Sequence, residues 1–284
     1  MEFAAISLLN GISFGMVLFL LTIGLSITLG LMGTLNLAHG ALYMIGAFVG
    51  WTAAVKLGLN YSLAVLLGGI AAGLVGLAIE RGLLRHLYKQ LNEQVVLTIG
   101  CIYILTNLSM WVWGGGYQAP FTGFTGSFPI GDMMYPVHRI ATIGIGLILF
   151  FAIRWLLEKT RLGAIVRAGM DDKEMTAGLG INLGRVTYLA FFLGCFVAGI
   201  AGVIGAQMMG ANLAMGWTIL LLALIVLVVG GAGSIQGALL GSMVIGIINA
   251  FGIALVPDFA RFFMYVVMII ILMVKPTGLL ARKA

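Results

Sequence analysis

Two glycine-rich stretches hold the side chains best suited to contact a small polar molecule. One reads TLNLAHGALYMIG over 34–46 and the other reads GAGSIQGALLGS over 231–242, and in each a polar break precedes Gly-Ala-Leu. Breaks at matching places of two halves favour a ligand-binding site, because the freed backbone groups need water or a ligand. The residues that we assign to such a site are Asn36, His39, Gly40, Gly230, Gly231, Gly233, Ser234 and Gln236.

The side chains in these breaks are neutral donors and acceptors, which suit a molecule that passes without tight capture. A second interpretation is that Asn36 and His39 only satisfy helix ends and pack against a neighbouring helix. The glycines likewise fit either a pathway or close helix packing. The sequence leaves both interpretations open.

A short helix is predicted in the most polar stretch of the chain. Asp171 or Asp172 can act as its N-cap, and Glu174 stands where it could complete a capping box with Asp171. Gly178 or Gly180 can end the helix in a left-handed conformation. The stretch should therefore contain one or two helical turns between bends.

This polar stretch, 158–185, has two interpretations. Small or flexible apolar side chains could enter a groove on a partner while the charges around them fix the orientation. The alternative is an ordinary solvated loop. The apolar residues concerned are Met175, Ala177, Leu179 and Ile181.

Composition places most of the chain in lipid. Of its 284 residues 62% are hydrophobic and 8% are charged, with a mean hydropathy of +1.15, whereas a soluble domain carries about a quarter charged residues. The net charge of +6 is dispersed among apolar segments, which indicates topology signals and no nucleic-acid partner. Cys101 and Cys195 lie in apolar segments far from His or acidic partners, so no disulfide framework and no metal site are expected.

The sequence shows no motif that would couple transport to an energy source. Its nine acidic residues all fall at segment ends or in loops, so no buried carboxylate relay is indicated. It has no GxxxxGK[ST] phosphate loop and no HExxH motif, so neither an ATPase nor a metalloprotease centre is expected. Covalent catalysis is not predicted, and any uphill movement would need energy from another subunit.

The expected fold is all-α, a single transmembrane domain over 1–284 with eight to ten membrane segments and glycine-broken helices. Crossing about 30 Å of hydrocarbon takes about 20 apolar residues, and nine segments give the best count. A count of eight or ten would need re-entrant or split stretches in 33–56 or 216–256. The nine segments lie near 6–32, 38–55, 61–80, 94–113, 140–157, 186–209, 216–230, 237–256 and 261–275.

Basic residues predict the orientation, because positive loops stay in the cytoplasm. Nine crossings put the N-terminus outside, the C-terminus inside and the segment 114–139 outside, where it forms either an ordered irregular cap or a linker. Lys56, Arg139 and Arg261 then fall outside. The basic residues assigned to the cytoplasm are Arg81, Arg85, Lys89, Arg154, Lys159, Arg161, Arg167, Lys173, Arg185, Lys275, Arg282 and Lys283.

The polar stretch resembles the cytoplasmic loop of high-affinity branched-chain amino acid permeases of the LivH type, whose superfamily includes ribose permeases. The pattern is G-x-x-x-R-A…E-x-A-x-x-x-G-I-N, although two residues intervene here between its glutamate and the following alanine. Similarity extends to 35–50, 190–206 and 228–246. The residues that the resemblance assigns to coupling with an ATPase are Gly163, Arg167, Ala168, Glu174, Ala177 or its neighbour Thr176, Gly180, Ile181 and Asn182. The cap candidate Asp171 completes the set predicted for coupling.

The resemblance implies a permease subunit of a binding-protein-dependent importer in a bacterial or archaeal cytoplasmic membrane. Its partners would be a second homologous permease, two ATP-binding subunits that hold ATP and Mg, and an extracytoplasmic solute-binding protein. No cofactor would bind to this chain itself. Two other hypotheses are an ion-coupled carrier and a passive channel for a small neutral solute such as urea.

Overall fold

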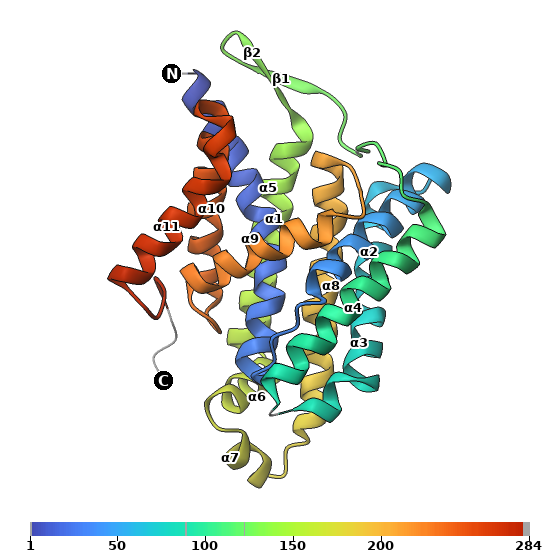
Figure 1. The fold of residues 1–284 in the computed structure, drawn as a ribbon, viewed down its shortest axis with the longest axis vertical. Coiled ribbons are helices and arrows are strands. Elements are labelled where there is room, and N and C mark those ends of the chain that lie inside the picture. The colour runs from blue at the N-terminus through green and yellow to red at the C-terminus, as the bar shows by residue number, and fades with distance from the viewer. Residues whose placement is uncertain (1, 89, 122, 281–284) are drawn as a thin grey trace.

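The long apolar runs of the sequence form the long helices of the computed structural model, which describes residues 2–88, 90–121 and 123–280. Within these ranges, six helices are long and apolar enough to cross a membrane. Figure 1 shows them arranged as a bundle. They are α1 (Glu2–Met32), α3 (Tyr61–Gly82), α4 (Leu91–Trp113), α5 (Val137–Lys159), α8 (Leu183–Met209) and α10 (Ile235–Leu255).

Shorter helices complete the bundle. Each of the nine predicted segments coincides with a helix, and the three shorter apolar ones are α2 (His39–Trp51), α9 (Met215–Gly230) and α11 (Ala260–Val274). A π-helical turn, Thr52–Lys56, extends α2, and 3-10 turns lie at Leu84–Leu87 and Pro257–Phe259. The prediction of a polytopic helical membrane protein is thereby confirmed at this coarser level. The two predicted breaks lie between separate helices, before α2 and before α10.

Helix α1 runs through the centre of the bundle (Figure 1) and contacts α5, α8, α9 and α10. In its most apolar window 83% of the residues are buried, against 22% for α4 and for α5. Its side chains Leu18, Phe19 and Leu20 are fully buried. The central position explains why α1 is apolar on all sides, since a helix surrounded by other helices has no face for water.

Glycines let α8 approach its neighbours closely. Gly46 of α2 lies against the backbone of Gly199 of α8, and Gly68 of α3 lies against the carbonyl of Gly46. Gly202, one turn along α8, lies against the carbonyl of Tyr43. Small residues at such crossings allow extensive backbone contact, which is a main source of helix association in lipid. Much of the glycine content is therefore explained by packing.

A β-hairpin stands in the segment 114–139, so the all-α expectation is incomplete there. Strand β1 (Ser127–Ile130) pairs with β2 (Met133–Pro136) in antiparallel register, with Phe128 opposite Tyr135. The turn depends on Gly131, whose φ of +63° lies in the left-handed region that glycine tolerates. Burial raises the pKa of the Tyr135 phenol above its ordinary value. The part of the segment over 127–136 is thus an ordered hairpin.

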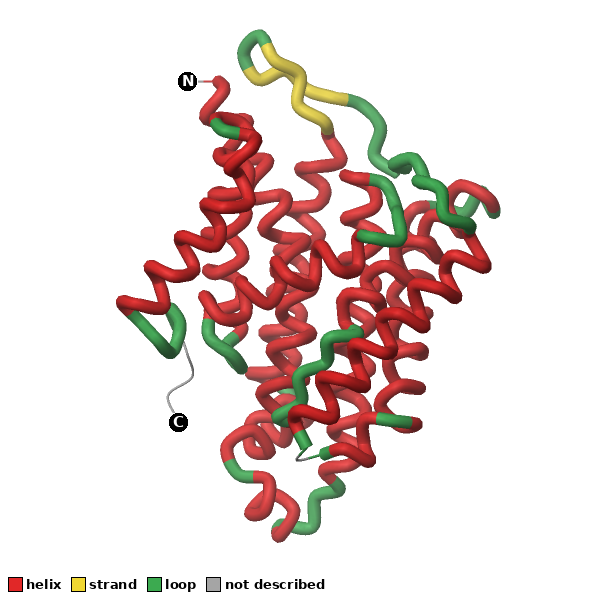
Figure 2. The backbone as a smooth tube through the Cα atoms, viewed as in Figure 1, coloured by secondary structure: helices red, strands yellow, loops and turns green. Residues whose placement is uncertain are grey.

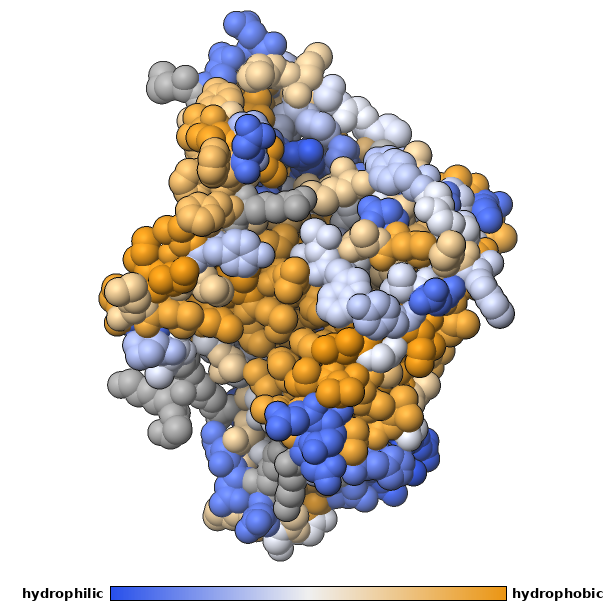
Figure 3. Space-filling model, viewed as in Figure 1, coloured by the Kyte–Doolittle hydropathy of each residue, from blue (hydrophilic) through white to orange (hydrophobic). Residues whose placement is uncertain are grey.

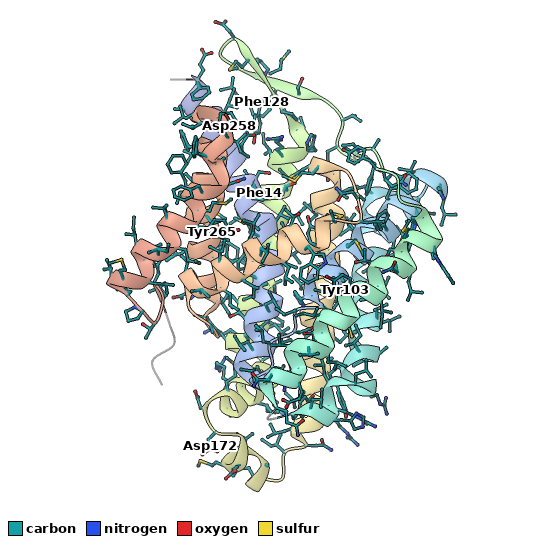
Figure 4. All side chains as sticks on the ribbon, viewed as in Figure 1. Phe14, Tyr103, Phe128, Asp172, Asp258 and Tyr265 are labelled. Carbon is teal, nitrogen blue, oxygen red and sulfur yellow. The ribbon has the colours of Figure 1, made fainter. Side chains whose placement is uncertain are left out.

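The polar and apolar surfaces divide along the bundle. In Figure 3 an apolar zone crosses the middle of the visible face and hydrophilic residues gather toward both ends. The loops lie mainly at the two ends in Figure 2, apart from the stretch that leads into α2. Figure 4 labels Asp172 at one end and Phe128 and Asp258 at the other. These are called below the loop end and the hairpin end.

The hairpin end also holds the start of α1 (Figure 1). At the loop end lie α6 (Arg161–Asp171) and α7 (Lys173–Gly178). Three basic residues that the predicted orientation counts, Lys89, Arg282 and Lys283, lie outside the described residues.

Candidate functional site

Side-chain caps start both helices of the polar stretch. The Thr160 hydroxyl accepts a hydrogen bond from the Gly163 amide at 3.1 Å and begins α6, and Asp172 accepts one from the Met175 amide at 2.9 Å and begins α7. Asp172 is therefore the N-cap. The predicted capping box between Asp171 and Glu174 is wrong, because with this cap the third helical position is occupied by Met175.

Helix α7 lies at the tip of the loop end (Figure 1). Met175 and Leu179 are 69% and 72% exposed, an unusual degree for large apolar side chains far from the apolar zone. The helix ends at Gly178, and Gly180 follows with a φ of +79°. The exposed members of the predicted coupling set are Ala168, Asp171, Glu174, Ala177, Gly180 and Asn182.

Three residues of the predicted coupling set shape the loop itself. Gly163 lies against the carbonyls at the end of α5, where a side chain would have no room. Asn182 accepts a hydrogen bond from the Arg185 amide at 3.2 Å and is the N-cap of α8. Ile181 is half-buried between the two helices. Gly163 therefore lets α6 begin close against the end of α5, and Asn182 fixes where α8 starts.

Arg167 departs from the rest of this set. Its side chain is half-buried, and its Nη1 is buried and makes no hydrogen bond within the described residues. It lines a cavity of about 390 Å³ together with Val166 and Met170 of α6. The other walls come from the second half of α1, the end of α5 and the start of α10. The structure thus places Arg167 toward the bundle interior.

The second break borders the same cavity. The Gly233 amide donates to the Ser26 hydroxyl of α1 at 2.9 Å, and the Ser234 hydroxyl accepts from the Gly237 amide at 3.0 Å as the N-cap of α10. Gly233 has a φ of +77°, a conformation that favours glycine. Gly233, Ser234 and Gln236 all line the cavity. Residues predicted for coupling and for binding therefore meet in one place.

Two glycines of the second break lie away from this cavity. Gly230 packs against Gly237, and Gly231 lies against Gly278. The amide of Leu280 donates to the carbonyl of Gly230 at 3.2 Å, and the Leu279 amide similarly caps the last turn of α9. Gly230 and Gly231 therefore lie where α9 ends. The last carbonyls of a helix have no partner within it, and here backbone amides from the end of the described chain donate to them.

The first break forms a separate, fully buried polar cluster. Thr34, Asn36 and His39 are at most 1% exposed, and the side-chain polar atoms of Thr34 and Asn36 make no hydrogen bond within the described residues. His39 lies against Gly24 of α1, and Gly40 lies against the carbonyl of Gly216 in α9. A buried group without a partner costs about 1–3 kcal/mol. Keeping the side chains of Thr34 and Asn36 buried in this state therefore costs free energy.

Both breaks meet α1 within one turn of helix. His39 reaches Gly24, and Gly233 bonds to Ser26 two residues further along. The cluster of the first break does not line the cavity. Helix α1 is consequently the element that the two breaks share.

Sequence reasoning missed several polar groups. Ser26 and Glu158 line the cavity, and a serine inside a long apolar helix was a usable signal for the first. Glu80, placed at a segment end by the sequence, is fully buried and accepts a hydrogen bond from Tyr88. Burial raises the pKa of Tyr88, and the carboxylate of Glu80 raises it further. No sequence signal distinguished Glu80 from a solvated acid.

One serine-hydrolase pattern was also overlooked. The run GISFG at 11–15 matches GxSxG, but it lies inside α1, whereas a nucleophile of this kind needs a sharp strand-to-helix turn. Ser13 donates to the Arg139 carbonyl at 3.1 Å. The match has no catalytic setting.

The chain matches the family described as branched-chain amino acid transport system, permease component, over residues 7–272. It belongs to this family. It is 31% identical to the high-affinity branched-chain amino acid transport system permease protein BraD of Pseudomonas aeruginosa, over 97% of this chain and 95% of that protein. It is 30% identical to the corresponding LivH of Salmonella typhimurium, over 96% and 94%.

The ribose import permease protein RbsC of Escherichia coli is a more distant relative of this permease, at 26% identity over 83% of the chain and 71% of the relative. The resemblance drawn from the polar stretch is confirmed, including the wider superfamily. The relatives are permease proteins of transport systems, so the chain is a multi-pass transport subunit and not an enzyme.

Proposed function

We propose that this permease forms the membrane passage of an ATP-driven importer for branched-chain amino acids. The observation that carries the proposal is similarity along nearly the whole length to permeases named for that transport. Two partner subunits would bind ATP and Mg and hydrolyse the nucleotide. A solute-binding protein would deliver the amino acid outside, and a second permease, identical or homologous, would complete the passage.

The proposed topology has nine crossings in a bacterial or archaeal cytoplasmic membrane. The N-terminus and the hairpin face the outside, and α6, α7 and the C-terminus face the cytoplasm. Support comes from the placement of the hairpin and of the α6–α7 loop at opposite ends of the bundle (Figure 1). Arg154, Lys159, Arg161 and Arg185 all belong to helix ends at the loop end, as the retention of positive loops requires.

The loop end is the proposed contact with the ATPase. Helix α7 and the residue that follows it offer two exposed apolar side chains, Met175 and Leu179, next to the exposed carboxylates of Asp172 and Glu174. An apolar anchor surrounded by charges is the usual form of a helix-in-groove contact. Closure of the ATPases would move this loop and change the state of the bundle.

The solute would pass along the two breaks. The unpaired side-chain amide of buried Asn36, beside His39, supports this role, and the cavity at Ser234 and Gln236 supports it on the loop-end side. Breaks that converge on one helix provide donors and acceptors at depth, where lipid supplies none.

Reconstitution tests the proposal. The permease is purified in mild detergent, its associated proteins are identified, and uptake into vesicles is measured with and without them. We expect an ATPase to copurify and leucine uptake to need it. Accumulation by the permease alone would favour an ion-coupled carrier, and leucine equilibration by the permease without ATP would favour a passive channel. Calorimetry of the binding protein with leucine, isoleucine, valine and urea identifies the solute.

A further inference from the structure

Two adjoining cavities at the loop end differ sharply in character. The larger, of about 390 Å³, is lined by Arg167 and Glu158, with neutral polar groups from Ser26, Ser234 and Gln236. The smaller, of about 50 Å³, is lined only by apolar side chains and glycine. Ile23, Ile27, Leu157 and Val166 line both, so the two cavities adjoin across a shared wall of side chains.

The larger cavity presents a charge of each sign. Arg167 forms no ion pair within the part of the chain that the structure describes, and its Nη1 is buried without a hydrogen bond. A guanidinium in this state is suited to a carboxylate, which it can bind through two parallel hydrogen bonds. Glu158 is held by Arg154, with 3.0 Å between Oε1 and Nε. A carboxylate accepts several hydrogen bonds, so Glu158 retains capacity for an ammonium group.

The apolar recess suits a small aliphatic side chain. Leu156, Leu162 and Leu193 contribute to its walls, and Ala190 and Gly194 of α8 line it as well. Burial of each methylene group in such a site contributes about 0.8 kcal/mol, whereas a polar side chain there would lose its hydrogen bonds to water. One positive and one negative side chain beside an apolar recess are complementary to an aliphatic α-amino acid, which carries an ammonium, a carboxylate and an apolar side chain.

We propose that the two cavities together bind a branched-chain amino acid as a zwitterion, with its carboxylate on Arg167, its ammonium on Glu158 and its side chain in the recess. This inference rests on the proposed function. It adds that the two cavities at the loop end bind the amino acid in its zwitterionic form. A neutral molecule such as urea would leave both charges unused. Because α6 supplies Val166 and Arg167, a movement of the coupling loop would change this site directly.

Protection of a cysteine probe tests the site in the whole transport complex. Gln236 lines the larger cavity and is exposed, so Gln236→Cys is labelled from the loop side in inside-out vesicles with a charged methanethiosulfonate reagent. The native Cys101 and Cys195 are buried, and the unsubstituted complex gives their background. We expect leucine to slow labelling, and isocaproate, isopentylamine and urea to do so only at much higher concentration.

Three variants in the probe background separate the parts of the site. Arg167→Gln should raise the leucine concentration for half-protection about tenfold to a hundredfold, because leucine would lose a charge-assisted hydrogen bond. Arg161→Gln removes the same charge from an exposed position on the same helix and should leave protection unchanged. Ala190→Leu fills the recess and should weaken protection by leucine while protection by alanine is retained. That change of preference would not follow from a general loss of folding.

Several results would overturn the proposal. Leucine that is transported by the complex but does not protect the probe rules out the site while leaving the proposed function intact. Equal protection by isocaproate or isopentylamine refutes recognition of a zwitterion. Labelling that depends on phosphatidylglycerol in the vesicles, and not on leucine, assigns Arg167 to a lipid phosphate. Absence of leucine uptake by the unsubstituted complex is the separate failure of the proposed function.

Discussion

Replacing the cap of α7 tests whether this short helix transmits the ATPase signal. Asp172 accepts the Met175 amide at 2.9 Å, and the Thr176 hydroxyl donates to the Asp172 carbonyl at 2.6 Å. The helix has only six residues, whereas isolated helices need about 12–15 to be marginally stable. Its formation therefore depends heavily on this cap.

The size of the effect follows from the cap energy. Asp172→Ala removes an N-cap worth about 1 kcal/mol, which lowers the helical population of α7 about fivefold when that population is small. If docking needs the helix, ATP-driven leucine uptake by the reconstituted complex should fall by up to about the same factor. The amount of permease in the membrane should not change, because Asp172 is exposed and contributes nothing to the bundle core.

Asp172→Ser is the matched control, since serine keeps a capping oxygen and loses the charge. We expect uptake near the wild-type level for serine and a loss for alanine. A loss of equal size in both variants would show that the charge acts on the partner directly. Wild-type uptake in Asp172→Ala would refute the role of a folded α7 in coupling.

Three further predictions concern other parts of the molecule. Met175→Ser combined with Leu179→Ser should weaken copurification of the ATPase, measured by quantitative pull-down, without altering thermal stability, and unchanged recovery would count against the α7 contact. Gly40→Leu should prevent stable folding, measured as loss of the monodisperse peak in detergent, because the added side chain meets the carbonyl of Gly216. Tyr88→Phe should lower the unfolding free energy by about 1–3 kcal/mol, because one oxygen of the buried Glu80 carboxylate loses its donor. A Tyr88→Phe variant as stable as wild type in detergent melting would show that Glu80 finds water instead.

The helices could be predicted from sequence because lipid leaves few alternatives. A run of about 20 apolar residues has to satisfy its backbone internally, so each predicted segment coincides with a helix. The cap of α7 was equally accessible, since Asp and Ser at the start of a helix act locally. What failed was the pairing of Asp171 with Glu174, where a shift of one residue changes every cap position.

The arrangement of the site required the three-dimensional structure. Arg167 belongs by pattern to the coupling loop, yet packing turns it toward Gly233 and Ser234, about 65 residues further along the chain. Nothing in its neighbours along the sequence indicates that contact. The hairpin was missed for a similar reason, since its register depends on pairs such as Phe128 with Tyr135 across a single glycine turn.

The central position of α1 also constrains the order of assembly. Its most apolar window is 83% enclosed, yet two of its main neighbours, α8 and α10, are synthesised more than 150 residues later. An apolar helix can rest in lipid alone until then. During biogenesis α1 is therefore exposed to lipid before it is enclosed, and a ribosome stalled before residue 183 would leave it without α8, α9 and α10. Proteases and chaperones of the membrane would meet that surface first.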